Sequence, residues 1–192
     1  MTARIYTRQG DSGSTTHPSG TRVPKTHAHI ELIGSLDELN AHLGLGVAHL
    51  VALSLPGLEP VRSVLLGAQR FLFDLTADLF REPASGTHTD APKDAGTPEV
   101  RALEEAMDAL GAALPPLTGF ILPGGRVASA ALHTARTVCR RAERRLAACL
   151  PSPVPPAWSR AQAYLNRLAD YLFVAARAVN HAGGEGDTLL HT

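Results

Sequence analysis

Apolar residues recur every three to four positions in five long stretches of the chain, and proline or glycine follows each stretch. This period places the apolar side chains along one face of an α-helix. It predicts helices over about 29–53, 58–81, 98–114, 127–150 and 157–181. Long helices with short connections pack as antiparallel neighbours. We therefore expect an all-α fold, an antiparallel five-helix bundle, in a single domain over 1–192.

The segments outside these helices differ in composition. The N-terminal segment, 1–26, is rich in Gly, Ser, Thr and Pro and has no helical period, which predicts a short extended piece at 5–7 and then loop. Gly, Pro, Thr and Asp fill 82–96, which predicts a further loop. The bundle is then expected over 27–182, with a polar tail at 183–192.

Charge and cysteine content exclude several classes of protein. Eighteen lysines and arginines balance eighteen aspartates and glutamates, so the chain lacks the basic excess typical of nucleic-acid or membrane-surface binders. Its two cysteines, Cys139 and Cys149, are too few for a disulfide framework. The first twenty residues hold no signal-peptide core, and the most apolar run, 43–55, is too short to span a bilayer. We expect a cytoplasmic protein with no membrane or nucleic-acid partner.

The fourth predicted helix concentrates positive charge. Between 136 and 145 it carries one acid, Glu143, and five arginines: Arg136, Arg140, Arg141, Arg144 and Arg145. Like charges one turn apart cost about 0.2–0.5 kcal/mol per pair in an isolated helix. An anionic ligand, or acids from another helix or subunit, would relieve this repulsion, and guanidinium forks match phosphate oxygens well. The alternative is a solvated surface stripe.

Other features are weaker signals when each is taken alone. Glycines and hydroxyl side chains within 7–16 could bring backbone N–H groups around a phosphate. Phe120 lies in an apolar loop, which favours a core plug over a wall for a flat apolar ligand. Asn166 lies at the edge of the buried side of the last helix. His27 and His29 form an H-x-H pair, but no Glu-x-x-His motif accompanies it, so we assign no metal to protein ligands.

Together these features resemble a known family. The motifs IYTRQGDSGST, RVPK, GSLDELNAHLG, FILPGG, ALHTARTVCRRAERR and YLNRLADYLFVAAR occur in the order seen in PduO-type ATP:cob(I)alamin adenosyltransferases. The resemblance covers the chain from about Arg4 to Val179. It implies a homotrimer of five-helix bundles with active sites between subunits. It also implies that the 5′-deoxyadenosyl group of ATP, bound with Mg²⁺, moves to Co(I) of cobalamin and that triphosphate is released.

The resemblance also implies roles for individual residues. Phe120 matches the aromatic side chain that displaces the lower axial base of cobalamin, and Asp37 matches an acid that bridges to Arg136 across the subunit interface. These three bind cobalamin and, with Arg140, form the implied catalytic set. The implied ATP-binding residues are Thr7, Arg8, Gln9, Gly10, Thr15, Thr16, Lys25, Arg140, Arg141, Glu143, Arg144 and Asn166. Arg8 is a departure, because lysine is common at that position.

Two other functions stay open at this point. The bundle could sense or deliver a nucleotide or corrinoid without transferring a group, or its arginine stripe could bind an acidic protein. The transferase activity itself would imply a flavin-type reductase that supplies the electron and a B12-dependent enzyme that uses the product. The sequence does not distinguish cobalamin from cobinamide as the preferred acceptor.

Overall fold

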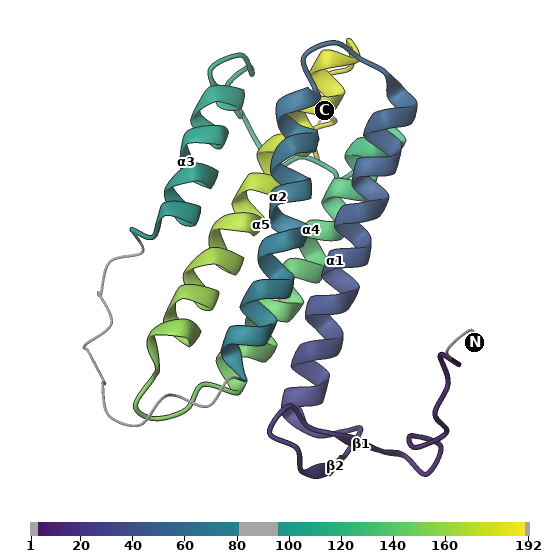
Figure 1. Ribbon diagram of the computed structural model, residues 1–192. Helices are drawn as coiled ribbons and strands as arrows, with labels where there is room; N and C mark the ends of the chain where they lie inside the picture. Colours follow the sequence, from purple (N-terminus) through teal and green to yellow (C-terminus); the bar gives the residue numbers. More distant parts are fainter. Residues whose placement is uncertain (1–3, 81–95, 191–192) are drawn as a thin grey trace.

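The computed structural model describes residues 4–80 and 96–190, and it confirms the five-helix bundle. The helices are α1 (Ala28–Leu53), α2 (Glu59–Leu79), α3 (Pro98–Gly111), α4 (Val127–Ala148) and α5 (Pro156–Ala182) (Figure 1). Each begins and ends within three residues of its predicted bounds. Nearly all of the predicted loop at 82–96 lies outside the described residues.

Alanine and leucine side chains fill different parts of the core between the helices. α4 and α5 contact each other extensively, and fully buried alanines such as Ala135, Ala142 and Ala175 allow their backbones to approach closely. Leucines from α1 and α2, among them Leu39 and Leu65, fill the remaining core. α3 packs mainly against α5 and is the outermost helix (Figure 1). None of the described helices is both long enough and apolar enough to cross a membrane.

The N-terminal segment contains a β-hairpin that the sequence did not predict. β1 (Ser14–Thr16) pairs antiparallel with β2 (Arg22–Pro24), whereas 5–7 have no strand partner among the described residues. Gly20 makes the turn possible because it adopts φ +87°, a conformation that side chains with a Cβ rarely take. The arm before β1 runs away from the bundle (Figure 1), and Ile5 on it is 99% exposed.

A chain of histidines anchors the hairpin to the end of the bundle. The backbone N–H of Ser19 donates to Nδ1 of His17, so the ring proton of neutral His17 is on Nε2. That Nε2 lies 3.0 Å from Nδ1 of His29 at the start of α1 and donates to it. The His29 ring in turn lies against Phe80 and Trp158, from the ends of α2 and α5. Both ring nitrogens of His17 therefore have partners within the chain, which makes the hairpin part of a packed cluster at this end of the bundle.

We expect the hairpin to detach from the bundle as the pH falls from about 7 to 5. Burial, with smaller contributions from the rings of His17 and His27, lowers the pKa of His29 below its ordinary value. The folded state therefore favours neutral His29. The contribution of the neutral ring to stability is present above the unfolded pKa of about 6.5 and is lost as the pH falls below it. The chain has a single tryptophan, Trp158, so its fluorescence reports on this contact.

The matched variants are His29→Phe, which should remove the pH dependence of that signal, and His49→Gln, which should keep it because His49 lies near the other end of α1. Fluorescence that does not change between pH 7 and 5 in the unmodified protein would contradict the prediction.

Candidate active site

The arginines of α4 divide into two groups according to their partners. Arg141 forms an ion pair with Glu38, and Arg145 forms one with Glu31; both acids are on α1. The two acids are seven residues apart, which places them on one face of α1, and that face packs against α4. These two guanidiniums are therefore already neutralised by acids of the same chain.

The other group, Arg136, Arg140 and Arg144, has no acidic partner in the described part of the chain, and we call it the free stripe. Arg140 and Arg144 are exposed, whereas Arg136 is partly buried and its Nε has no hydrogen-bond partner among the described residues. Three unpaired cations one turn apart repel one another. An anion bound along the free stripe would remove that cost.

Glu143 and Asn166 extend the free stripe toward α5. Nδ2 of Asn166 donates to Oε1 of Glu143 at 3.0 Å, so the structure brings together two residues that the sequence placed in one site. Both side chains are accessible to a ligand. The only acid between 136 and 145 is thus held by α5, not by a neighbouring arginine.

An apolar pocket of about 600 Å³ lies at the other end of the free stripe. Phe120 on its rim is 84% exposed, so the expectation that this loop plugs the core is wrong. The loop pairs with the C-terminal segment and so presents the ring to solvent and to the pocket. The residues that line the pocket are Leu117, Gly119, Phe120, Ile121, Pro123, His133, Arg136 and Phe173. A flat apolar ligand fits this lining better than a polar one does.

His133 belongs to this pocket, although it is not among the site residues predicted from the sequence. It lies one turn before Arg136 on α4, is 4% exposed, and its Nδ1 has no hydrogen-bond partner among the described residues. Burial, and after it the charge of Arg136, lowers the pKa of His133, which keeps the ring neutral. Its position one turn before Arg136 is the signal that could have identified it.

The N-terminal part of the predicted site forms a cluster of its own. Nη2 of Arg22 donates to the carbonyl of Gln9 at 2.8 Å, and the Lys25 side chain lies against Gly10. Arg8 precedes them with φ +60°, an uncommon conformation for a residue with a side chain. These contacts gather Gln9, Gly10 and Lys25 into one loop that β1 and β2 hold in place.

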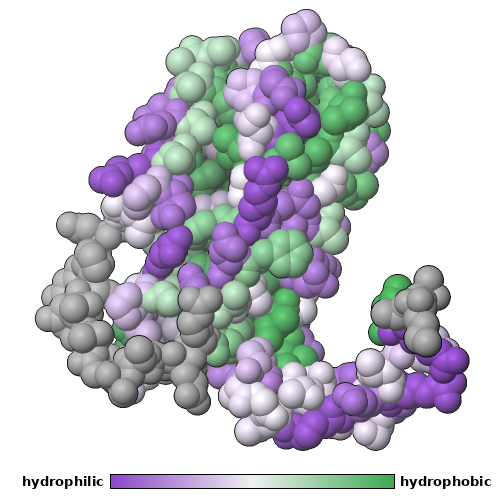
Figure 2. Space-filling view, viewed as in Figure 1, coloured by the Kyte–Doolittle hydropathy of each residue, from purple (hydrophilic) through white to green (hydrophobic). Residues whose placement is uncertain are grey.

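The structure does not bring this cluster to the free stripe within one chain. Among the described residues, no hydrogen bond or ion pair joins 4–25 to the arginines of α4. The arm is largely hydrophilic and lies away from the bundle (Figure 2). Asp37 likewise is exposed and forms no ion pair with Arg136 in this chain. The two halves of the predicted site are therefore not joined within this chain.

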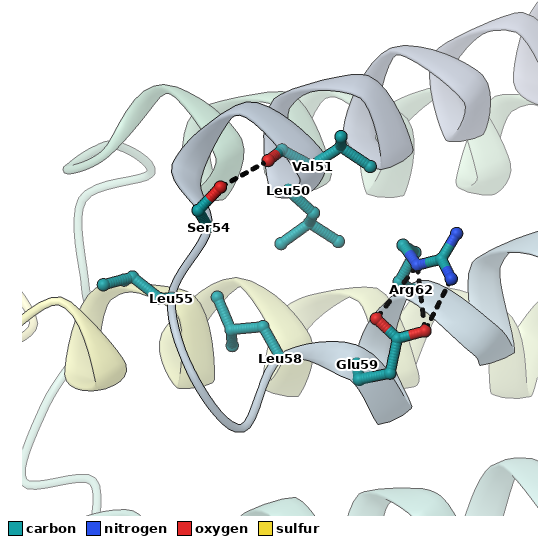
Figure 3. A pocket seen from close by; sticks show the side chains of 7 residues that line it. All are labelled: Leu50, Val51, Ser54, Leu55, Leu58, Glu59 and Arg62. Carbon is teal, nitrogen blue, oxygen red and sulfur yellow. Dashed lines mark hydrogen bonds and ion pairs between the residues drawn. The ribbon is translucent and has the colours of Figure 1, made fainter.

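Two further features lie outside the site. The hollow at the turn between α1 and α2 contains none of the predicted site residues, and Glu59 and Arg62 in it are paired with each other (Figure 3). Cys139 is fully buried and its thiol donates to the carbonyl of Leu165. Burial raises the pKa of Cys139, so the thiol is not a nucleophile at neutral pH.

The fold and the site define an all-helical protein that can bind a polyanion on one helix beside an apolar ligand in an adjoining pocket. Residues 5–179 match the family model described as cobalamin adenosyltransferase. The chain belongs to that family, and it is an enzyme of the adenosyltransferase class.

Known relatives span almost the whole chain. It is 43% identical to the cobalamin adenosyltransferase of Cupriavidus metallidurans, covering 97% of this chain and 94% of the relative. It is 41% identical to the corrinoid adenosyltransferase of Bacillus subtilis, and the match covers 96% of this chain and 90% of the relative. A variant PduO-type ATP:corrinoid adenosyltransferase from Lactobacillus reuteri, solved with cobalamin and ATP, superimposes with a TM-score of 0.81 at 31% identity, covering 98% and 97% of the two chains.

Proposed function

We propose that the protein transfers the 5′-deoxyadenosyl group of ATP to Co(I) of cobalamin and releases triphosphate, as a step in adenosylcobalamin synthesis. The observation that carries this proposal is the free stripe, because one helix connects an unpaired polycationic surface to the pocket of Phe120. Relatives named as corrinoid adenosyltransferases, and a neighbour solved with both ligands, support it.

The chemistry needs few protein groups. The electron pair of Co(I) attacks C5′ of ATP, the Co–C bond forms, and the C5′–O bond breaks with its electrons leaving on triphosphate. No amino-acid base is required, since no proton is transferred. The protein's part is to hold C5′ in line with cobalt and to stabilise the negative charge on the departing triphosphate. Arg140 and Arg144 would provide this charge stabilisation, with Arg141 and the Glu143–Asn166 pair positioning the nucleotide.

Mg²⁺ would enter with ATP. It binds proteins through one or two carboxylates together with substrate phosphates, and the described residues form no cluster of three metal-ligating side chains. Glu143 is the carboxylate on the free stripe's helix that fits such a role, and the phosphates would supply the other ligands.

Phe120 would act on the cobalt before transfer. Its ring would occupy the space of the lower axial base with apolar surface. Without an axial donor the acceptor orbital of Co(II) falls in energy, which makes reduction to Co(I) easier. The exposure of Phe120 above a pocket lined by Phe173 and His133 supports this role.

The proposed active site is completed by a second copy of the chain in a homotrimer. The loop of Thr7 to Gly10, Thr15, Thr16 and Lys25 from one subunit would meet the free stripe of its neighbour, and Asp37 of one would meet Arg136 of the other. The arm that lies away from its own bundle supports this arrangement, as do the exposed Asp37 and the Arg136 Nε that has no hydrogen-bond partner among the described residues.

Subunit mixing tests this arrangement. Lys25→Ala and Arg140→Ala should each inactivate the enzyme, but random assembly of an equimolar mixture of the two chains into trimers should restore activity at about a quarter of all interfaces, where an intact arm meets an intact stripe. The control mixes Arg140→Ala with Arg144→Ala, which share one half of the site and should not complement. Failure of the first pair to complement would place the whole site in one chain.

The central experiment is an adenosylation assay with ATP, Mg²⁺ and chemically reduced cobalamin, following formation of the Co–C bond by absorbance. Product formation with release of triphosphate supports the proposal. Binding of both ligands without a Co–C bond would identify a carrier or sensor instead. Absence of an ATP-dependent thermal shift would favour a protein that binds an acidic partner through the same stripe. Cytoplasmic location and the reductase and B12-dependent partners stay predictions.

A further inference from the structure

The loop that carries Phe120 is paired with the C-terminal segment, which the sequence analysis expected to be only a polar tail. The N–H of Leu122 donates to the carbonyl of Thr188, and the N–H of Leu190 donates to the carbonyl of Phe120, each at 2.8 Å. Between them Ile121 faces Leu189 in an antiparallel bridge. The backbone of Phe120 is therefore bonded to residues 187–190, which we call the bracing tail.

A buried ion pair fastens the bracing tail to α5. Nε of Arg177 lies 2.7 Å from a carboxylate oxygen of Asp187, and the two side chains are 8% and 14% exposed. Nη2 of the same guanidinium donates to the carbonyl of Pro115 at 2.7 Å. Arg177 thus joins the beginning of the loop to the bracing tail. A buried guanidinium needs such partners, since burying it unpaired is strongly unfavourable.

The other end of the loop is held by Asn180. Its Nδ2 donates to the carbonyl of Gly124 at 3.2 Å, and its Oδ1 accepts from the N–H of Arg126 at 3.0 Å. Gly125 between them adopts φ +86°, and a Cβ there would lie 2.4 Å from Asn180 Oδ1. Both ends of the loop are therefore fixed to α5, and only its middle depends on the bracing tail.

Phe120 itself lies in that middle part. Its ring is 84% exposed and so receives little support from packing. The direction of the ring is then set by its backbone, and two of the backbone bonds flanking it come from the bracing tail. Across the pocket lie His133, Arg136 and Phe173, so a shift of the loop would change the width of the space between them.

We propose that the bracing tail positions Phe120 over the pocket, with Arg177 and Asp187 as the positioning residues that fasten it. The proposal rests on the proposed function, because Phe120 takes its role from that function. Neither positioning residue lines the pocket or belongs to the free stripe. They act by keeping the loop in the one arrangement that places the aromatic ring at the lower face of the corrin.

The first test is Asp187→Ala in the full chain. We expect the KM for cobalamin to rise about tenfold while the KM for ATP changes less than about twofold, because the loop is displaced and the free stripe is not. The fraction of four-coordinate Co(II), read by electron paramagnetic resonance, should fall in parallel. The matched control is Glu185→Ala, an acid two residues earlier whose exposed carboxylate pairs with Arg126. It should leave both measurements unchanged.

A second variant protects the test against misfolding. Leu190→Pro removes the N–H that binds the Phe120 carbonyl and leaves the buried ion pair intact. It should give the same loss of four-coordinate Co(II) as Asp187→Ala, with the far-ultraviolet circular dichroism of the helices unchanged. In a Phe120→Ala background, Asp187→Ala should have no further effect on either quantity, because the group that it positions is absent.

Equal rises in both KM values, or effects that multiply in the double variant, would overturn the proposal and leave a general structural role. Amide hydrogen exchange separates this outcome from failure of the proposed function, since it needs no turnover. Asp187→Ala should accelerate exchange at Leu122 and Leu190 by at least about tenfold if the tail braces the loop. Unchanged exchange would overturn the proposed role of the bracing tail, even if the enzyme is active. Faster exchange in a protein without transferase activity would support the role of the bracing tail and contradict the proposed function.

Discussion

Replacing Arg140 with alanine should abolish turnover of ATP and reduced cobalamin. Arg140 is exposed at the middle of the free stripe and has no acidic partner among the described residues, so its charge would be available to the triphosphate that the proposed reaction releases. Loss of one donor that stabilises developing charge typically lowers turnover about 10²- to 10³-fold, or about 2.7–4 kcal/mol of barrier. Steady-state kinetics of Co–C bond formation measure the effect.

Arg145→Ala is the matched control for this variant. Arg145 lies on the same helix, but it pairs with Glu31 on α1 and is not part of the free stripe. Its loss removes a partly exposed ion pair worth about 0.2–1 kcal/mol and should leave turnover close to normal. Near-normal activity of Arg140→Ala, or an equal loss in both variants, would remove Arg140 from the site.

Phe120→Ala should lower turnover strongly while leaving the fold intact. The ring is 84% exposed, so its removal should change the free energy of unfolding by about 0.5 kcal/mol or less. What it should remove is the apolar surface that we propose displaces the lower axial base. The spectrum of the bound Co(II) form should therefore lose its four-coordinate component, which absorbance or electron paramagnetic resonance detects.

The control for this change is Phe73→Ala. Phe73 lies on α2, is 68% exposed and does not line the pocket of Phe120. Both variants should unfold at similar temperatures, and only Phe120→Ala should lose the cobalt signal. Four-coordinate Co(II) formed to the normal extent by Phe120→Ala would show that the ring has no part in ligand displacement.

The helices could be predicted from sequence because their information is local. The apolar period fixes each buried face, and Thr97 followed by Pro98 marks the start of α3, where the Thr97 hydroxyl indeed accepts from the N–H of Val100. The hairpin could not be predicted in the same way. Its strands are three residues long, and its position depends on contacts of His17 with Phe80 and with His29, which come from other elements.

The candidate site likewise combines features that the local sequence determines with features that depend on distant segments. The sequence predicted a cationic ridge on α4, but which arginines remain unpaired depends on Glu31 and Glu38 of a helix about one hundred residues earlier. Phe120 was expected to pack inward because apolar loop residues usually do. Its exposure follows from pairing with Leu190, a contact between segments that no local pattern links. Long-range pairing, and not residue type, therefore decides both cases.

The bracing tail limits how this chain can be joined to other sequences. Ends of a domain are normally the safest places for an affinity tag or a fused reporter, because few contacts fix them. Here Leu190 is hydrogen-bonded to the loop of the proposed corrin pocket, and the opposite end of the chain leads into the proposed nucleotide loop. A bulky fusion directly after Leu190 would crowd the proposed corrin pocket. A bulky fusion directly before Thr7 would crowd the proposed nucleotide loop. A long flexible spacer, or insertion into an exposed turn between helices, is the better design.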